Sequence, residues 1–342
     1  MTALFLSREP TLEEYWRAIV LFGRNVASYK FALAKSLLEI RPAAGQLLKL
    51  EDLAPTYSRH LSQHLQGANK QGTFKSSKFL DACRKSNTGE INASQLIEAT
   101  VRYGFSNVID AFHVVGQRET PQRFYIDERK INAGIRITDE FASLLNSSQM
   151  VDLPQEVEAR WRLVETAWEL GITRSLVAVD YDTSTESLVY VDKSRRRGPI
   201  TGSRDSLNGY QKGRCFYCYS EIHIDPSGPS HPDVDHFFPH ILKRITSTIS
   251  IDGIWNLVLA CKDCNRGIGG KFDRVPNLAL LERLHRRNEF LISSHHPLRE
   301  VLMQQTGNSE GARATFLNST HNQARAVLIH EWAPVQKANP CF

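Results

Sequence analysis

Apolar positions in the first 190 residues recur mostly at helical spacing. Thr11-Leu-Glu-Glu14 has the pattern of a capping box and precedes the apolar stretch Tyr15 to Phe22, which predicts that a helix begins there. The same periodicity predicts helices over residues 26–40, 77–85, 93–104 and 156–171. Short β-rich runs predict strands over 123–127 and 134–138 and a hairpin over 175–181 and 187–192. We therefore expect this region to be mostly helical, with a mixed segment near its end.

The pattern breaks at Ser194-Arg-Arg-Arg-Gly-Pro-Ile-Thr-Gly202, where a charge run meets Gly and Pro. Such a segment is typical of a domain boundary. Its arginines, Arg195, Arg196 and Arg197, either contact phosphates or belong to a solvated linker. Apolar periodicity over 278–292 and 324–332 predicts C-terminal helices. On these patterns the protein is of the α+β class, with a helical accessory region over 1–195 for target or partner recognition, a small module over 203–275, and C-terminal helices over 276–342 that pack on the module.

Composition agrees with an ordinary globular protein, because 41% of the 342 residues are hydrophobic and 23% are charged. The first ten residues lack the basic lead and long apolar run of a secretory signal, and no stretch approaches the roughly 18 apolar residues of a membrane span. We therefore expect a cytoplasmic protein that makes no membrane contact. Thiols stay reduced in the cytoplasm, so paired cysteines there favour metal binding over disulfides.

Two Cys-x-x-Cys pairs are the most informative motif of the chain. Cys215-Phe-Tyr-Cys218 and Cys261-Lys-Asp-Cys264 each have the spacing at which two thiolates on a tight turn converge on one tetrahedral ion. Four such ligands would close a structural zinc site, which would stabilise a module too small to bury a core unaided. Cys83 and Cys341 have no partner at this spacing and are interpreted as ordinary thiols.

Between the cysteine pairs, the sequence predicts a strand, a second strand and a short helix. Val234 to Phe238 is a short β run stopped by Pro239, and Leu257 to Ala260 is an apolar run of strand length. Lys262 to Gly267 suits a short helix that ends at glycine.

In this order of elements and motifs, roughly residues 205 to 275 resemble the HNH, or ββα-metal, nuclease family. The resemblance is carried by the following residues in the family's order: Asp235-His236-Phe-Phe-Pro239, Asn256-Leu257, and Cys261-Lys-Asp-Cys264-Asn265-Arg266-Gly267. It implies a metal-dependent endonuclease that hydrolyses phosphodiester bonds in DNA.

The resemblance also implies a role for each residue of the motif. His236 would be the general base that deprotonates the attacking water, and Asp235 and Asn265 would hold one catalytic Mg²⁺ or Mn²⁺. Asn256 would brace the loop that carries the histidine. Arg266 and Lys271 are candidate phosphate contacts or surface charges. His240 either assists at the metal or is a capping or surface histidine.

One geometric conflict accompanies these roles. Adjacent residues of a regular strand face opposite sides, so Asp235 and His236 cannot both face one ion from a flat strand. We therefore predict a bend or bulge there, just before Pro239.

Charge supports a nucleic-acid partner. Thirteen Lys and Arg but only eight Asp and Glu lie between Lys193 and Arg274, which accounts for the whole formal excess of +5. A basic region suits a phosphate backbone, although a solvated surface has the same composition and four thiolates with one Zn²⁺ would lower the local charge. We expect DNA as the substrate. A protein partner or a second copy would bind through the N-terminal region. Analogy suggests a restriction or anti-phage defence setting.

Alternative functions remain open on the sequence. The region could be a non-catalytic zinc module that binds nucleic acid, or a nuclease that acts on RNA. A zinc deaminase is excluded, because no His-x-Glu precedes a Pro-Cys-x-x-Cys. His330-Glu331 is not a zincin motif, since position 334 is proline.

Overall fold

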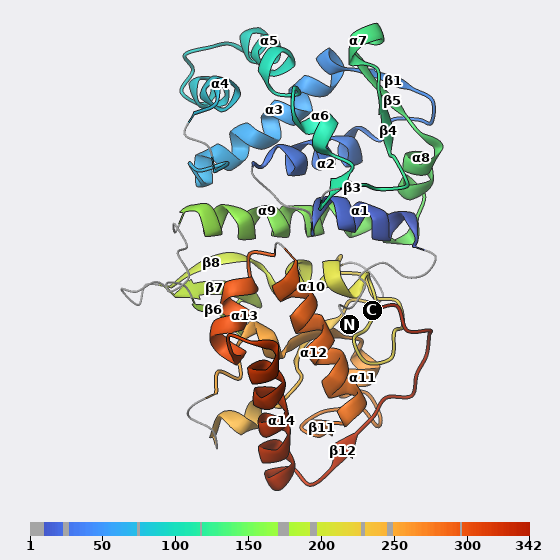
Figure 1. Cartoon of the computed structure of the whole chain (residues 1–342), viewed down its shortest axis with the longest axis vertical. Helices are drawn as coiled ribbons and strands as arrows, with labels where there is room; N and C mark the ends of the chain where they lie inside the picture. The colour runs from blue at the N-terminus through green and yellow to red at the C-terminus, as the bar shows by residue number, and fades with distance from the viewer. Residues whose placement is uncertain are drawn as a thin grey trace. The chain divides into compact units, whose positions relative to one another are not determined.

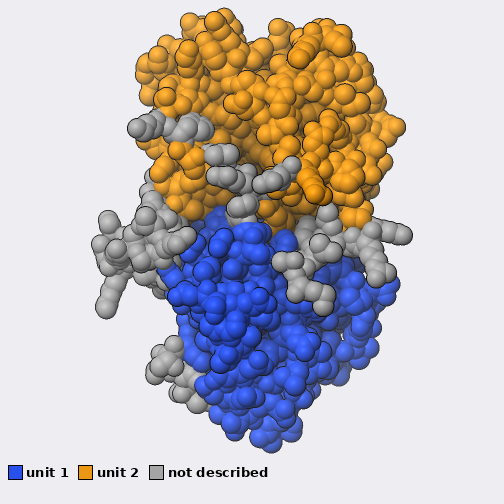
Figure 2. Space-filling model, viewed as in Figure 1, with its two compact units in different colours: residues 1–8, 172–342 blue, residues 9–171 orange. Residues whose placement is uncertain are grey.

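The chain forms an α+β protein whose helices and small sheets gather in two compact units, one within residues 9–171 and one within 172–342 (Figures 1 and 2). The computed structural model describes residues 10–22, 27–73, 76–116, 118–169, 178–191, 197–226, 230–244, 249–294 and 296–342. None of the helices in these ranges has the length and apolar character that a membrane span requires.

The division near residue 171 differs from the expected boundary at 194–202. Strand β7 (Ser187–Val191) pairs with β6 (Ala178–Asp182) on one side and with β8 (Arg197–Gly202) on the other. This three-stranded antiparallel sheet joins the predicted hairpin to the residues that follow it, so both belong to the cysteine-containing unit. Arg195 and Arg196 lie outside the described residues, and for Arg197 only the backbone, within β8, is described.

The unit within residues 9–171 is built mainly from helices. Its helical elements are α1 (Leu12–Val20), α2 (Tyr29–Ile40), α3 (Leu50–Gly67), α4 (Lys78–Asn87), α5 (Ala93–Tyr103), α6 (Val108–Ala111), α7 (Arg129–Asn132), α8 (Asp139–Leu145), a 3₁₀ turn over Ser148–Val151, and α9 (Leu153–Glu169). Its strands are β1 (Leu47–Lys49), β2 (Val114–Val115), β3 (Arg118–Glu119), β4 (Tyr125–Asp127) and β5 (Gly134–Ile137). β5 lies between β1 and β4 in one antiparallel sheet, and β2 pairs with β3.

Capping residues explain where several of these helices begin. The Thr11 side chain accepts a hydrogen bond from the Glu14 amide at 3.3 Å, and Ser77 does the same for Leu80 at 3.2 Å. Asn92 caps α5 in a full capping box. Such caps satisfy amides that the first helical turn leaves unpaired. The helices predicted from periodicity in this region are confirmed, although α2 begins at Tyr29 and residues 23–26 lie outside the described part of the chain.

A buried ion pair joins the first helix of this unit to its last, and an aromatic contact of the first helix lies beside it. Trp16 of α1 lies against Phe124 at 5.2 Å between ring centroids. Beside it, Arg17 donates to both oxygens of Glu156 in α9, and both side chains are buried. A planar guanidinium that faces a carboxylate in this two-bond geometry compensates its own desolvation better than a single contact does.

The unit within residues 172–342 contains the cysteine module and the C-terminal helices. Its remaining elements are α10 (Ser203–Gln211), β9 (Asp233–His236), 3₁₀ turns η2 (His240–Arg244) and η3 (Ile254–Asn256), β10 (Leu257–Ala260), α11 (Lys262–Arg266), β11 (Val275–Pro276), α12 (Leu278–Ser293), α13 (Arg299–Thr306), α14 (Glu310–Val327) and β12 (Glu331–Trp332). The predicted order of strand, strand and helix is confirmed by β9, β10 and α11. β9 pairs antiparallel with β10, which is buried along its whole length.

The C-terminal region departs from prediction at its last helix. Residues 324–332 were expected to be helical, but α14 ends at Val327 and β12 pairs in parallel with β11. Asn277 donates its amide to the Trp332 carbonyl at 2.9 Å, and Trp332 itself is buried. Strand pairing and the burial of Trp332 thus override the helical periodicity of this segment.

Helix α12 packs on the module, with α14 beside it (Figure 1). Its buried Arg287 donates to the carbonyl of Trp255 at 2.9 Å, and Arg283 donates to the carbonyl of Tyr217 at 2.8 Å. Burial lowers the pKa of Arg287 to about 10. These two arginines therefore support the module from within, whereas Arg286 of the same helix is exposed.

Candidate active site and metal centre

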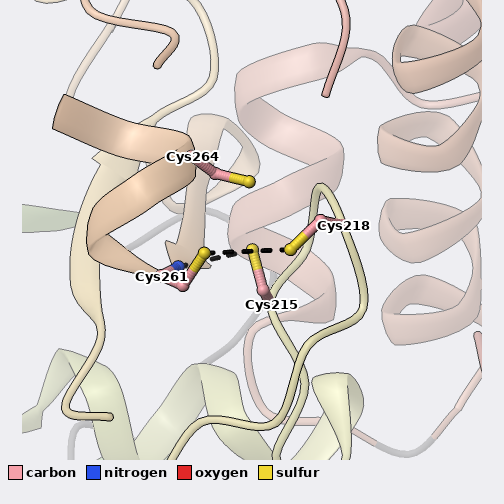
Figure 3. Close-up of side chains that lie close together, drawn as sticks. All are labelled: Cys215, Cys218, Cys261 and Cys264. Carbon is pink, nitrogen blue, oxygen red and sulfur yellow. Dashed lines mark hydrogen bonds between the residues drawn. The ribbon is translucent and has the colours of Figure 1, made fainter. Parts of the chain in front are cut away.

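Four cysteine sulfurs meet where the first cysteine loop faces α11. The Sγ atoms of Cys215, Cys218, Cys261 and Cys264 all lie within 4.8 Å of one another, and the side chains point toward a common centre (Figure 3). Cys218 Sγ and Cys261 Sγ are 3.8 Å apart. That distance is far too long for a disulfide. It matches the roughly 3.8 Å edge of a tetrahedron whose sulfurs lie about 2.3 Å from a central zinc. The four residues can therefore bind one metal ion of the zinc type, as the spacing predicts.

Local backbone geometry brings the first pair of cysteines together. The Tyr219 amide donates to the Cys215 carbonyl at 3.0 Å, which closes a tight turn, and Tyr219 adopts a left-handed φ of 62°. The Arg283 guanidinium lies 4.1 Å from the centre of the Tyr219 ring, a cation–π contact that covers the turn. The second pair lies at the start of α11, where the Cys261 amide donates to Cys215 Sγ at 3.3 Å.

A segment from the end of the sequence crosses this site. The amides of Lys337 and Ala338 both donate to the Cys218 carbonyl, at 3.1 and 3.2 Å. The Lys337 ammonium contacts Asp263 of α11 at 2.6 Å. The Phe342 ring packs on Tyr219 with 5.0 Å between centroids. Residues 337–342 thus connect the two cysteine pairs, a connection that the sequence pattern did not indicate.

His236 lies at the end of β9 and points toward an acidic partner. Its Nε2 is 3.1 Å from Asp252 Oδ1, and the His240 ring lies beside it at 5.2 Å between centroids. The imidazole is largely buried, with 11% of its side chain exposed. Nδ1 of His236 has no hydrogen-bond partner among the described residues. The ring is therefore held through one nitrogen while the other is unengaged.

Asn256 braces the loop that follows His236. The completely buried amide accepts a hydrogen bond from the Phe238 N–H at 2.8 Å and donates to the Phe238 carbonyl at 3.0 Å and to the Ile251 carbonyl at 2.9 Å. A single side chain thus ties the turn after β9 to the segment before β10. The family resemblance implies this bracing role for Asn256.

Replacing Asn256 by alanine should destabilise this unit. The change leaves the Phe238 N–H and two carbonyls buried without their partner, so we expect a loss of about 2 kcal/mol in the free energy of unfolding. Urea denaturation of Asn256→Ala, beside the exposed Asn318→Ala on α14 as control, measures it. Equal midpoints for the two variants would contradict the bracing role.

Asp235 faces away from His236 and toward the interior. Its Oδ2 accepts from the Tyr217 hydroxyl at 2.6 Å, and its Oδ1 lies 3.2 Å from the Lys271 ammonium, whose side chain is 1% exposed. Burial raises the pKa of Asp235, against the opposing influence of Lys271 and Tyr217. Lys271 is therefore an internal counter-charge, which corrects both its expected roles, phosphate contact and surface charge.

The conflict between Asp235 and His236 is not resolved by a bulge. β9 keeps one register against β10 from Asp233 to His236, so the predicted bulge is wrong. The chain does bend just before Pro239, at Phe237 and Phe238, but this bend follows the pair and leaves the strand alternation intact.

Asn265 and Arg266 of α11 contact a different acid, Asp233. The Asn265 amide nitrogen donates to Asp233 Oδ2 at 3.0 Å, and Arg266 Nε lies 3.0 Å from the same oxygen. Arg266 remains largely exposed, with 60% of its side chain open. Arg266 therefore keeps an exposed guanidinium, unlike the buried Lys271, and it is already paired with the carboxylate of Asp233.

The expected ligands of the catalytic ion do not converge. Both oxygens of Asp235 are engaged by Tyr217 and Lys271, and Asn265 directs its amide nitrogen to Asp233. Within the described ranges, the four cysteines are the one group of His, Cys, Asp or Glu side chains found close enough to share an ion. Asp235 and Asn265 as placed do not fit a divalent cation, because the Lys271 ammonium already pairs with the Asp235 carboxylate and the Asn265 amide nitrogen faces Asp233.

Asp252 is the important residue that the sequence analysis missed. Besides His236, its Oδ1 lies 3.5 Å from His240 Nε2, and its Oδ2 pairs with Lys243 of η2. His240 thus shares the acid with His236 and is 55% exposed. Burial would raise the pKa of Asp252, but hydrogen bonds from His236 and Lys243 hold it at about 2. The acid is therefore ionised at neutral pH.

Comparisons of the chain with protein-family models, curated proteins and solved structures find no match.

Proposed function

We propose that this protein is a zinc-stabilised endonuclease that hydrolyses phosphodiester bonds in DNA, with His236 as general base. The observation that carries the proposal is the partly exposed imidazole of His236 at the end of β9, hydrogen bonded to ionised Asp252 at 3.1 Å and supported by the Asn256 brace. Zinc in the four-cysteine site would be structural, because four protein ligands leave no open coordination position.

Hydrolysis needs a group that removes the proton of the attacking water. A neutral imidazole does this at neutral pH, and Nδ1 of His236 has no hydrogen-bond partner among the described residues. The carboxylate of Asp252 would stabilise the imidazolium that forms. His236 is the last residue of β9, so a phosphate would approach its Nδ1 from the end of the strand.

Charge near the reacting phosphate would come from the basic side chains of this unit. Arg266 presents an exposed guanidinium beside Asp233, and Lys243 lies beside Asp252. A guanidinium can exchange a carboxylate for a phosphate oxygen, since it binds both in the same two-bond geometry. The proposal assigns no step to a divalent ion, since Asp235 and Asn265 are engaged elsewhere.

Plasmid cleavage tests the proposal. Purified full-length protein is incubated with supercoiled DNA, in separate reactions with Mg²⁺, Mn²⁺ or EDTA, and with a labelled RNA of matched length. We expect nicked or linear DNA from the native chain, and a rate about 100-fold lower for His236→Ala, because general base catalysis contributes at least that factor. His285→Ala, a partly exposed histidine of α12, is the matched control.

Each alternative function gives a different pattern in this assay. A binding module would retard DNA without cutting it, and His236→Ala would bind equally well. A ribonuclease would cut the RNA and leave the plasmid supercoiled. Equal nicking by the native chain and His236→Ala would point to a contaminant and end the proposal.

A further inference from the structure

We propose that Asp252 is a positioning residue that fixes the tautomer of His236, so that Nε2 carries the proton and Nδ1 is the reactive base. This inference rests on the proposed nuclease function and deepens it. It assigns a role to a residue outside the motif and identifies which atom of the imidazole meets the water.

The contact between the two side chains has the geometry of a hydrogen bond. His236 Nε2 and Asp252 Oδ1 are 3.1 Å apart, and the side chains are only 11% and 22% exposed. Such partial burial limits the competition from water, so the contact can orient the ring. The Tyr181 ring of β6 lies 5.8 Å from the His236 ring between centroids and restricts it further.

Backbone hydrogen bonds hold Asp252 in place. Its carbonyl accepts from the Tyr181 amide at 3.1 Å, so the acid is tied to strand β6. The next residue, Gly253, donates to the Ser250 carbonyl at 3.0 Å and accepts from the Asn256 amide at 2.9 Å. The carboxylate is therefore presented from a turn anchored to β6 and to η3. Such support is what a group needs if it is to orient another side chain.

The charged and titratable groups around the His236 ring favour an ionised Asp252 carboxylate. Lys243 pairs with Oδ2 of Asp252, and His240 approaches Oδ1 at 3.5 Å. With these cationic or donor groups around it, Asp252 is an anion and can only accept hydrogen bonds. The facing Tyr181 contributes a ring contact to His236.

The tautomer follows from this arrangement. A neutral imidazole carries one proton, and an anionic acceptor at Nε2 places it there. Nδ1 is then left with its lone pair, and it has no hydrogen-bond partner among the described residues. When Nδ1 takes the proton of the water, the carboxylate stabilises the resulting imidazolium without any rearrangement. Without this contact the ring would populate both tautomers, and Nδ1 would carry the proton and be unable to act as a base in a fraction of the molecules.

Histidine-selective ¹⁵N NMR of the full-length chain tests the tautomer directly. The His236 resonance is identified by its loss in His236→Ala. At a pH where the ring is neutral, we expect the native signal to show protonated Nε2 and bare Nδ1. In Asp252→Asn the amide can donate to Nε2, so the signal should move toward the opposite tautomer. A native ring protonated at Nδ1 would overturn the proposal, even if the variant does not fold.

Cleavage kinetics provide the second measurement. Asp252→Asn should lower kcat about 100-fold and leave KM within about 3-fold, because an orienting residue acts on the reaction rather than on substrate binding. Asp182→Asn, in the neighbouring hairpin, should cut like the native chain. Native kinetics for Asp252→Asn, or a loss of rate with an unchanged tautomer, would overturn the positioning role. If the native chain cuts no substrate, the proposed nuclease function fails, whereas the NMR result still decides whether Asp252 fixes the ring.

Discussion

Removal of the metal from the four-cysteine site is expected to unfold the module that carries His236. The metal would join two segments far apart in the sequence, and structural zinc contributes on the order of 10 kcal/mol to folding in small zinc modules. Without it, four thiols buried or half-buried within 4.8 Å of one another have no cation to compensate their charge when they ionise. We therefore expect about one zinc per purified chain, and loss of the cooperative unfolding of this unit after chelation.

Elemental analysis and thermal unfolding with and without a strong chelator measure these effects. Cys218→Ser should reproduce the chelated state, and cleavage should disappear in both. Cys341→Ser is the matched control, because this cysteine lies in the same unit but outside the cluster. A chain that contains no metal and still unfolds at the temperature of the untreated protein would contradict the structural role.

Replacement of Lys271 by methionine is expected to destabilise the same unit by about 3 to 5 kcal/mol, the usual result of breaking a buried ion pair on one side. The carboxylate of Asp235 would remain buried with only the Tyr217 hydroxyl as a donor. Changing the acid as well, in the double variant with Asp235→Asn, should recover much of the loss, because no uncompensated charge then remains. Lys262→Met, at an exposed lysine of α11, should change the stability little.

Thermal unfolding with added Mn²⁺ separates this structural role of Asp235 from the metal role that the family resemblance implies. If the ion pair is structural, Mn²⁺ will leave the unfolding temperature of the native chain unchanged. If Asp235 exchanges the ammonium for an ion, Mn²⁺ will stabilise the native chain, and Lys271→Met more strongly. The second result would restore Asp235 as a ligand.

Sequence patterns predicted the elements around the site because local signals agree there. The β9 strand is stopped by Pro239, β10 is a continuous apolar run, and α11 begins directly at the second cysteine pair. Cysteine spacing also predicted the sulfur cluster, since four ligands of one ion must meet wherever the chain places them.

The partners of the site residues were harder to predict, because they depend on packing between distant segments. Asp252 lies 16 residues from His236, in a turn that contacts with β6 and with Asn256 hold close to it. Nothing in the local pattern distinguishes it from a surface acid. Strand alternation did predict that Asp235 and His236 would face opposite sides. The bulge invoked to reconcile them was wrong because β10 fixes the register of β9.

The contacts of the α12 arginines also depend on packing between distant segments. Arg283 and Arg287 lie on the helix face that packs on the module, where their long side chains reach buried carbonyls. A formal charge in the sequence does not tell whether its head group meets solvent or the protein interior.

The segment 337–342 has a consequence for how the protein is made. The unit within residues 9–171 is continuous in sequence and can fold while synthesis proceeds, whereas the contacts around Cys218 include Lys337, Ala338 and Phe342. Translation must therefore pass residue 342 before the contacts around Cys218 are complete.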